Sequence, residues 1–143
     1  MVKKFENLVS DKILVQHAPK PNMYSPYLAG GPDFWKAVPG AVAQFAFYYV
    51  EKTGMFNEGP HTHKAEEYLM FLSTDPKDQK SLGATVEIAF GEEWEKYSFD
   101  FATFVRFPQG LIHCPVYVRR LERPFLIGHF WPGGEPAHFD DLH

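Results

Sequence analysis

Residues 59–71 carry side chains that can bind a metal ion, because His61 and His63 are followed by Glu67. The side chains of an extended strand alternate between its two faces, so these three residues, which share one parity, would point to one side of a sheet. A second segment, residues 108–113, places His113 three residues after Gly110, and its proline and glycine are typical of a tight turn. Three imidazoles and one carboxylate form a ligand set for a divalent metal ion.

The two segments read His-x-His-x3-Glu and Pro-x-Gly-x2-His, and this pair of patterns resembles the two motifs of the cupin superfamily. The resemblance implies a small β-barrel that holds one divalent metal ion inside. Its implied ligands are His61, His63, Glu67 and His113. Because oxygen and nitrogen ligands are mixed, Fe, Mn, Ni, Co and Zn ions all suit such a site, and the sequence does not choose among them.

A simpler interpretation of the same residues competes with the metal site. In that interpretation His61 and His63 lie in a polar loop after a Gly-Pro pair, and Glu66 and Glu67 are ordinary solvated charges. The presence of both motifs in the expected order favours the metal site, because a motif gains weight only when its context agrees.

The rest of the sequence must supply strands that position these side chains. Hydrophobic residues make up 45% and aromatic residues 17% of the chain, which favours strands because aromatic side chains pack well on pleated sheets. Short apolar segments between turn residues predict strands at 11–17, 41–51, 61–72, 83–90, 94–99, 103–107, 116–120 and 125–131. We therefore predict an all-β fold, a double-stranded, jelly-roll-like β-barrel of the cupin type.

The 143 residues suit one domain. Residues 1–40 are rich in proline and glycine, which interrupt strands, so we expect them to form an irregular N-terminal arm. The barrel is expected over residues 41–131 and a tail over residues 132–143.

Charge and composition exclude several classes of partner. The formal net charge is −4, and no basic run is longer than the Arg119-Arg120 pair, so we expect no nucleic-acid partner. No segment has the ~20 apolar residues of a membrane-spanning helix, and the N-terminus lacks the apolar core of a signal peptide. The only cysteine fits a reducing compartment. We expect a cytoplasmic protein without a membrane partner.

Three further residues raise the question of catalysis. His129 lies in an apolar strand, where it could serve as an acid or base near the metal if it faces inward, or as a hydrogen-bonded structural histidine. Arg106 is the other candidate for a charged group over the metal. Cys114 follows His113, but neighbouring strand residues point to opposite faces, so we expect Cys114 to pack on the outer layer rather than act as a nucleophile.

Leu69 and Phe71 share the parity of Glu67, and Leu111 shares that of His113, which predicts a mostly apolar ligand pocket around the metal. Such a pocket suits a small, oxygen-rich or aromatic molecule, such as a keto acid. The resemblance implies a metal-dependent enzyme of the dioxygenase, isomerase or decarboxylase kind. The alternative is a non-catalytic module that binds a small ligand or uses the metal to stiffen the barrel, because fold alone does not settle function.

A homodimer is expected from two apolar features. The segment 41–51 is apolar on both faces and must be covered on both. Phe34 and Trp35 lie in the arm, where little local core is available to bury them.

Overall fold

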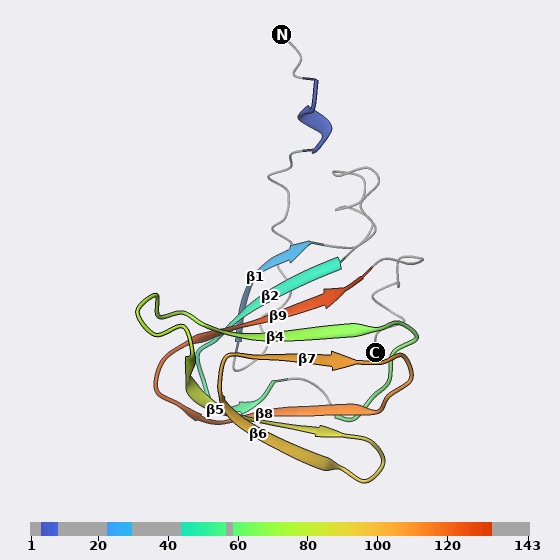
Figure 1. Ribbon diagram of the computed structural model, residues 1–143, viewed down its shortest axis with the longest axis vertical. Helices are drawn as coiled ribbons and strands as arrows, with labels where there is room; N and C mark the ends of the chain where they lie inside the picture. Colours follow the sequence, from blue (N-terminus) through green and yellow to red (C-terminus); the bar gives the residue numbers. More distant parts are fainter. Residues whose placement is uncertain (1–3, 9–22, 30–43, 57–58, 133–143) are drawn as a thin grey trace.

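The computed structural model describes residues 4–8, 23–29, 44–56 and 59–132 (Figure 1). A short 3-10 helix, η1 (Glu6–Leu8), precedes the strands. The strands of the described residues are β1 (Met23–Ala29), β2 (Gln44–Val50), β3 (Gly54–Met55), β4 (Glu67–Ser73), β5 (Ser81–Phe90), β6 (Glu95–Phe101), β7 (Thr103–Phe107), β8 (His113–Leu121) and β9 (Phe125–Trp131).

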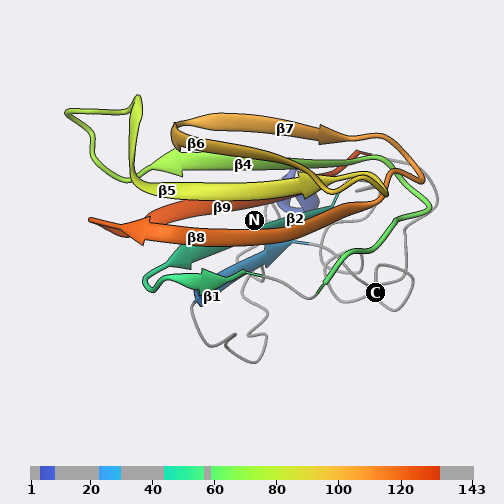
Figure 2. The same cartoon turned by 90° about the horizontal axis from the view of Figure 1, so that it is seen from below.

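These strands form two antiparallel sheets. The five-stranded sheet has the order β1-β2-β9-β4-β7, and the four-stranded sheet has the order β3-β8-β5-β6. Seen from below, β5, β6 and β8 lie in front of the five-stranded sheet (Figure 2). The two sheets do not close through a continuous hydrogen-bonded ladder within the described ranges, but the predicted all-β, double-sheet architecture is confirmed.

The core lies between the two sheets and follows from the alternation of side chains along the strands. Leu69 and Phe71 of β4 face inward together with Ile127 of β9, and all three are buried. Phe71 packs against Phe99 of β6 with ring centroids 4.9 Å apart, so the two sheets meet through direct aromatic contact.

Strand β1 was not predicted, because its residues lie in the segment that we expected to be irregular. It pairs with β2 at the edge of the five-stranded sheet, with a register shift between Tyr24 and Tyr27. Pro26 lies within this shift. Proline lacks a backbone N–H and is tolerated in sheets at edges and bulges, which explains how a proline-containing segment joins the sheet.

The first strand that the sequence predicted, at residues 11–17, lies outside the described residues, as do Phe34 and Trp35. Two other boundaries differ from the expectation. The turn region at 54–59 contains β3, which pairs with β8. The predicted strand at 61–72 becomes regular only at Glu67, where β4 begins.

Candidate metal centre

The four predicted ligands come from two segments that lie side by side. His61 and His113 form an isolated antiparallel bridge, in which the N–H of each donates to the carbonyl oxygen of the other at 3.1 Å and 3.0 Å. His63 lies in the irregular segment after this bridge, and Glu67 opens β4. The assumption of one continuous strand from residue 61 was therefore wrong, although its consequence, the convergence of the side chains, is observed.

The predicted turn before His113 is confirmed, and it helps to hold His63. The N–H of Leu111 donates to the carbonyl oxygen of Pro108 at 3.1 Å. Gly110 has a φ of 80°, which glycine adopts without steric cost. Its N–H donates to the carbonyl oxygen of His63 at 3.0 Å, which ties the two metal-binding segments together.

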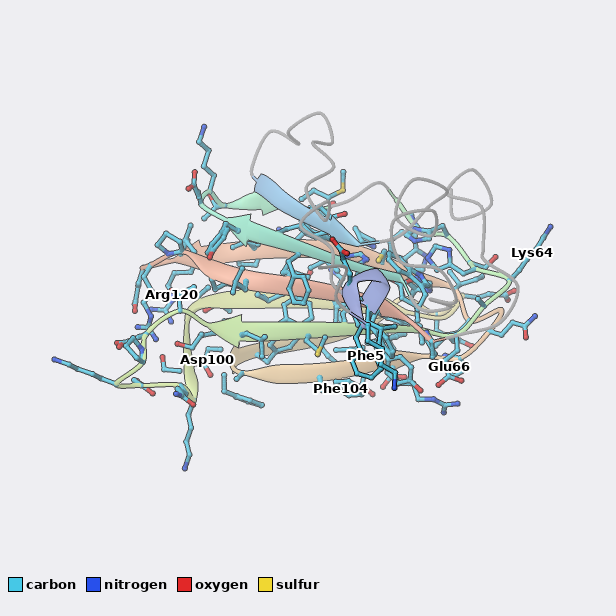
Figure 3. All side chains as sticks on the ribbon, turned by 90° about the horizontal axis from the view of Figure 1, so that it is seen from above. Phe5, Lys64, Glu66, Asp100, Phe104 and Arg120 are labelled. Carbon is cyan, nitrogen blue, oxygen red and sulfur yellow. The ribbon has the colours of Figure 1, made fainter. Side chains whose placement is uncertain are left out.

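The site lies at one end of the two sheets. Lys64 and Glu66, which lie between His63 and Glu67 in sequence, are at this end, whereas Asp100 and Arg120 lie at the opposite end (Figure 3). The rings of the three histidines gather there, with centroids 4.6 Å apart for His61 and His113, 4.7 Å for His61 and His63, and 4.9 Å for His63 and His113.

The carboxylate of Glu67 contacts two of these imidazole rings. Its Oε2 lies 2.7 Å from Nε2 of His63 and 3.4 Å from Nε2 of His113. The exposed fractions of His63, Glu67 and His113 are 7%, 3% and 2%. These side chains are buried in a common cluster, so the interpretation of a polar loop with a solvated Glu67 is wrong.

Backbone carbonyls orient two of the imidazoles. Nδ1 of His61 donates to the carbonyl oxygen of Gly59 at 2.9 Å, and Nδ1 of His113 donates to that of Leu111 at 2.8 Å. A carbonyl oxygen only accepts, so Nδ1 carries the proton in both rings. The lone pair of each neutral ring is then on Nε2, the arrangement that outer hydrogen bonds impose on metal-binding histidines.

A metal ion would satisfy polar atoms that the protein leaves unpaired. Oε2 of Glu67 and Nε2 of His113 are buried and make no hydrogen bond within the part of the chain that the structure describes. Buried polar atoms normally have a partner. Two ring nitrogens and a carboxylate oxygen, all within 4.8 Å of one another, are a donor set that fits a divalent transition metal.

The protonation states also suit metal binding. Burial alone would raise the pKa of Glu67, but contacts with the imidazoles of His113, His129 and His63 outweigh it and hold this pKa well below its ordinary range. Burial lowers the pKa of His61, and the neighbouring His113 and His63 add to this effect. At neutral pH the carboxylate is therefore ionised and the His61 ring is neutral, as metal ligands must be.

His129 faces inward and joins the cluster from β9. Its Nδ1 lies 3.1 Å from Oε1 of Glu67, whereas the contacts of His63 and His113 given above are to Oε2. The ring packs against aromatic residues, with centroid distances of 5.4 Å to Tyr48, 5.5 Å to Phe56 and 5.3 Å to Trp131. The structure thus places this catalytic candidate beside a predicted ligand.

Tyr48 and Phe107 belong to the site, although the sequence did not identify them. Burial, followed by the nearby charge of Glu67, raises the pKa of Tyr48 to about 12, so this hydroxyl stays protonated. Phe107 stacks on His113 with ring centroids 4.1 Å apart. Tyr48 shares one face of its strand with Val50, which is buried. The sequence could not identify this face as the inward one, because both faces of the strand are apolar.

Arg106 is not brought to the cluster. It pairs in register with Tyr68, whereas Glu67 pairs with Phe107, so Arg106 lies on the other face of the sheet from Glu67. There its Nε and Nη2 donate to the two carboxylate oxygens of Glu66 at 2.7 Å and 3.1 Å. This bidentate pair, with a hydrogen bond from Tyr68, holds the pKa of Glu66 at about 2.

The predicted pocket residues differ in their distance from the site. Leu69 pairs in register with His129 and is buried beside the cluster. Phe71 lies deeper, in the core against Phe99. Leu111 is half-buried in the turn before His113. Their role as a ligand pocket stays a prediction.

Cys114 does not pack on the outer layer as expected, but is buried in the hydrophobic core. Its φ of 74° interrupts the strand alternation, so that His113 and Cys114 both face inward. A nitrogen of His61, a nitrogen of His113 and the sulfur of Cys114 lie within 4.8 Å of one another.

Comparisons with known proteins find a likeness in structure alone. No protein-family profile and no curated protein matches the sequence.

In the described residues, no helix is long and apolar enough to cross a membrane.

Solved structures show the same fold. KdgF from Halomonas sp. is 15% identical with a TM-score of 0.51, over 83% of this chain and 86% of that chain. A cupin superfamily protein from Desulfitobacterium hafniense DCB-2 is 11% identical with a TM-score of 0.53, over 86% and 97%. An oxalate oxidase in complex with the substrate analogue glycolate is 16% identical with a TM-score of 0.57, over 91% of this chain and 61% of that chain.

Proposed function

We propose that this chain, which has the fold of the cupin superfamily, binds one divalent transition-metal ion through His61, His63, Glu67 and His113. We further propose that it is a metal-dependent enzyme acting on a small oxygen-rich or aromatic molecule. The observation that carries the proposal is the buried contact of Glu67 Oε2 with the imidazoles of His63 and His113. Among the residues that the structure describes, neither this Oε2 nor His113 Nε2 has a hydrogen-bond partner. Removing such a charge from water is costly unless a cation compensates it.

The protein would orient the metal ligands, hold a proton near them and exclude water from part of the site. A bound ion supplies Lewis-acid chemistry, which polarises an oxygen atom of a ligand. His129 can hold a proton at Nδ1 against Oε1 of Glu67, within the reach that acid–base chemistry requires. Phe107, stacked on His113, and Leu69, buried beside His129, exclude water from one side of the cluster. His61 is only half-buried and lies on the side from which a ligand can approach.

The small-molecule substrate class rests on the apolar surroundings. Among the described residues, apolar side chains such as Phe56, Phe107 and Leu69 lie beside the cluster. The metal would then supply most of the polar anchoring, which suits a keto acid or a small aromatic molecule. The glycolate bound by the oxalate oxidase is an example of an oxygen-rich molecule in a protein of this fold. The alternative is a non-catalytic module that holds such a ligand without turnover. His129 favours an enzyme, because a site that only stiffens the fold needs no titratable group beside its carboxylate.

The test loads the purified protein with Fe²⁺, Mn²⁺, Ni²⁺, Co²⁺ or Zn²⁺ and measures oxygen consumption and product formation with catechols, thiols and keto acids. The proposal predicts metal-dependent turnover of at least one compound. It also predicts that His129→Gln keeps the metal but changes the pH profile of turnover. Binding of keto acids to the metal-loaded protein without turnover favours the binding module. Tight, metal-independent binding of a nucleotide sugar contradicts the pocket argument.

We also propose that two copies of the chain associate through the outer face of the five-stranded sheet. Phe104 is 61% exposed on this face, and Phe45 and Phe130, whose rings are in contact, lie on the same face. Exposed apolar surface of this kind is typical of interaction sites. A cytoplasmic location, without nucleic-acid or membrane partners, stays a prediction from the net charge of −4 and the single cysteine.

A further inference from the structure

The metal centre contains a second group of ligand atoms, and one of them, the sulfur of Cys114, is not used by the proposed function. Two sets of residues each bring three ligand atoms within 4.8 Å of one another: His63, Glu67 and His113 form one set, and His61, His113 and Cys114 form the other. His113 belongs to both. The two sets therefore overlap at one imidazole and differ in the third kind of donor, which is a carboxylate oxygen in one and a sulfur in the other.

The shared imidazole, that of His113, is oriented to bind a metal ion through Nε2. Nδ1 of His113 donates to the carbonyl oxygen of Leu111, which leaves Nε2 as the atom with a lone pair. This Nε2 is fully buried and has no hydrogen-bond partner among the described residues. Nδ1 of His61 is likewise engaged by the carbonyl oxygen of Gly59, so its Nε2 is also the atom left for a ligand.

We propose that His61, His113 and Cys114 form a thiophilic metal site that overlaps the carboxylate site of Glu67. This inference rests on the proposed metal binding and specifies which ions the centre takes and how. Sulfur and imidazole ligands prefer ions such as Zn²⁺ and Cd²⁺, whereas carboxylates prefer harder ions such as Mn²⁺. Zn²⁺ or Cd²⁺ recruits the sulfur of Cys114, with release of the thiol proton to solvent, and Mn²⁺ is held by Glu67.

The two sites exclude each other, because the single lone pair of His113 Nε2 binds one ion at a time. The metal that occupies the centre thus decides whether Glu67 or Cys114 is a ligand. In the absence of Cys114, the centre keeps the His63, Glu67 and His113 set and loses only its preference for thiophilic ions.

The experiment uses Co²⁺ as a spectroscopic probe, because a cobalt–thiolate bond produces a strong charge-transfer band in the near ultraviolet. We expect this band in the Co²⁺-loaded wild-type protein and its loss in Cys114→Ser and Cys114→Ala. Affinities measured by competition with a chelator should show that either variant weakens Cd²⁺ by about tenfold or more and leaves Mn²⁺ nearly unchanged. Glu67→Gln should do the reverse: Mn²⁺ binding is weakened by about 10–100-fold or more, and the Co²⁺ charge-transfer band persists.

The spectrum of the Co²⁺-loaded wild-type protein tests for a thiolate ligand even if the cysteine variants fold poorly. Binding of Co²⁺ without a thiolate band overturns the thiophilic site and leaves the proposed carboxylate site standing. An equal loss of Cd²⁺ and Mn²⁺ affinity in a folded Cys114→Ala protein also overturns it. If the wild-type protein binds no ion at all, both proposals fail.

Discussion

Glu66 and Glu67 are neighbours in sequence, yet their carboxylates lie on opposite sides of the five-stranded sheet. The Glu67 side chain is 4% exposed and lies among three imidazoles. The Glu66 side chain is 31% exposed and forms a bidentate pair with Arg106. This difference follows from the alternation of side chains at the start of β4. It also provides a matched pair of variants with the same chemistry.

Replacement of these two carboxylates should separate metal binding from general charge effects. We expect Glu67→Gln to weaken Mn²⁺ binding by about 10–100-fold or more, because it removes an anionic ligand whose burial only a cation offsets. Glu66→Gln should bind Mn²⁺ like the wild type, since its carboxylate faces away from the site. Calorimetric titration measures both. Equal losses of affinity in the two variants would contradict the assignment of Glu67.

Metal occupancy should fall in acid, because imidazoles must be neutral to bind. Burial lowers the pKa of His61, so this ring stays neutral to a lower pH than an ordinary histidine, whose pKa is about 6.5. We expect full occupancy at neutral pH and a decline below about pH 6. Dialysis at a series of pH values followed by elemental analysis measures this decline. Full occupancy down to about pH 4, with rapid metal exchange, would count against imidazole ligands.

Alkaline stability should depend on Tyr48. Burial and the charge of Glu67 raise its pKa from 10.0 to about 12, so the folded state holds this proton more tightly than the unfolded state. The associated stability is complete below pH 10.0 and is lost as the pH rises to about 12. Denaturant unfolding of Tyr48→Phe should show a smaller decline in this window than the wild type. Tyrosinate absorbance should show one late-titrating group that the variant lacks. A wild type without that group would refute the prediction.

The proposed dimer can be tested with two exposed phenylalanines. Light scattering should return twice the chain mass of 16.4 kDa for the wild type. Phe104→Asp on the five-stranded sheet should give a monomer, because a charge at the contact must be desolvated. Phe101→Asp serves as the control, since Phe101 is 57% exposed but lies on the four-stranded sheet. A monomeric wild type, or an equal effect of both variants, would disprove this interface.

Much of the candidate site could be predicted because it depends on residue types and spacing. The spacing of the histidines and the glutamate predicts the ligand set without any geometry, and His113 follows a turn that proline and glycine specify locally. The predicted continuity from residue 61 to Glu67 failed because His61 is held by a bridge to His113, which is distant in sequence. Such long-range pairing leaves no signal in the alternation of a single strand.

The remaining differences from the sequence-based expectation have other structural causes. Cys114 was assigned to the outer layer because alternation assumes extended backbone, and its positive φ breaks that rule. The inward position of Tyr48 could not be chosen, since its strand is apolar on both faces. Strand β1 contains Pro26, and only its position at the edge of the sheet makes that acceptable.

The most direct test of the metal centre is elemental analysis and metal titration of the wild type and of His113→Ala. His113 contributes to both ligand sets, and its buried Nε2 has no other partner among the described residues. We predict that the wild type binds one equivalent of a divalent transition metal and that His113→Ala loses it, while circular dichroism shows an unchanged fold. A folded His113→Ala protein that keeps full metal occupancy and affinity would contradict the account.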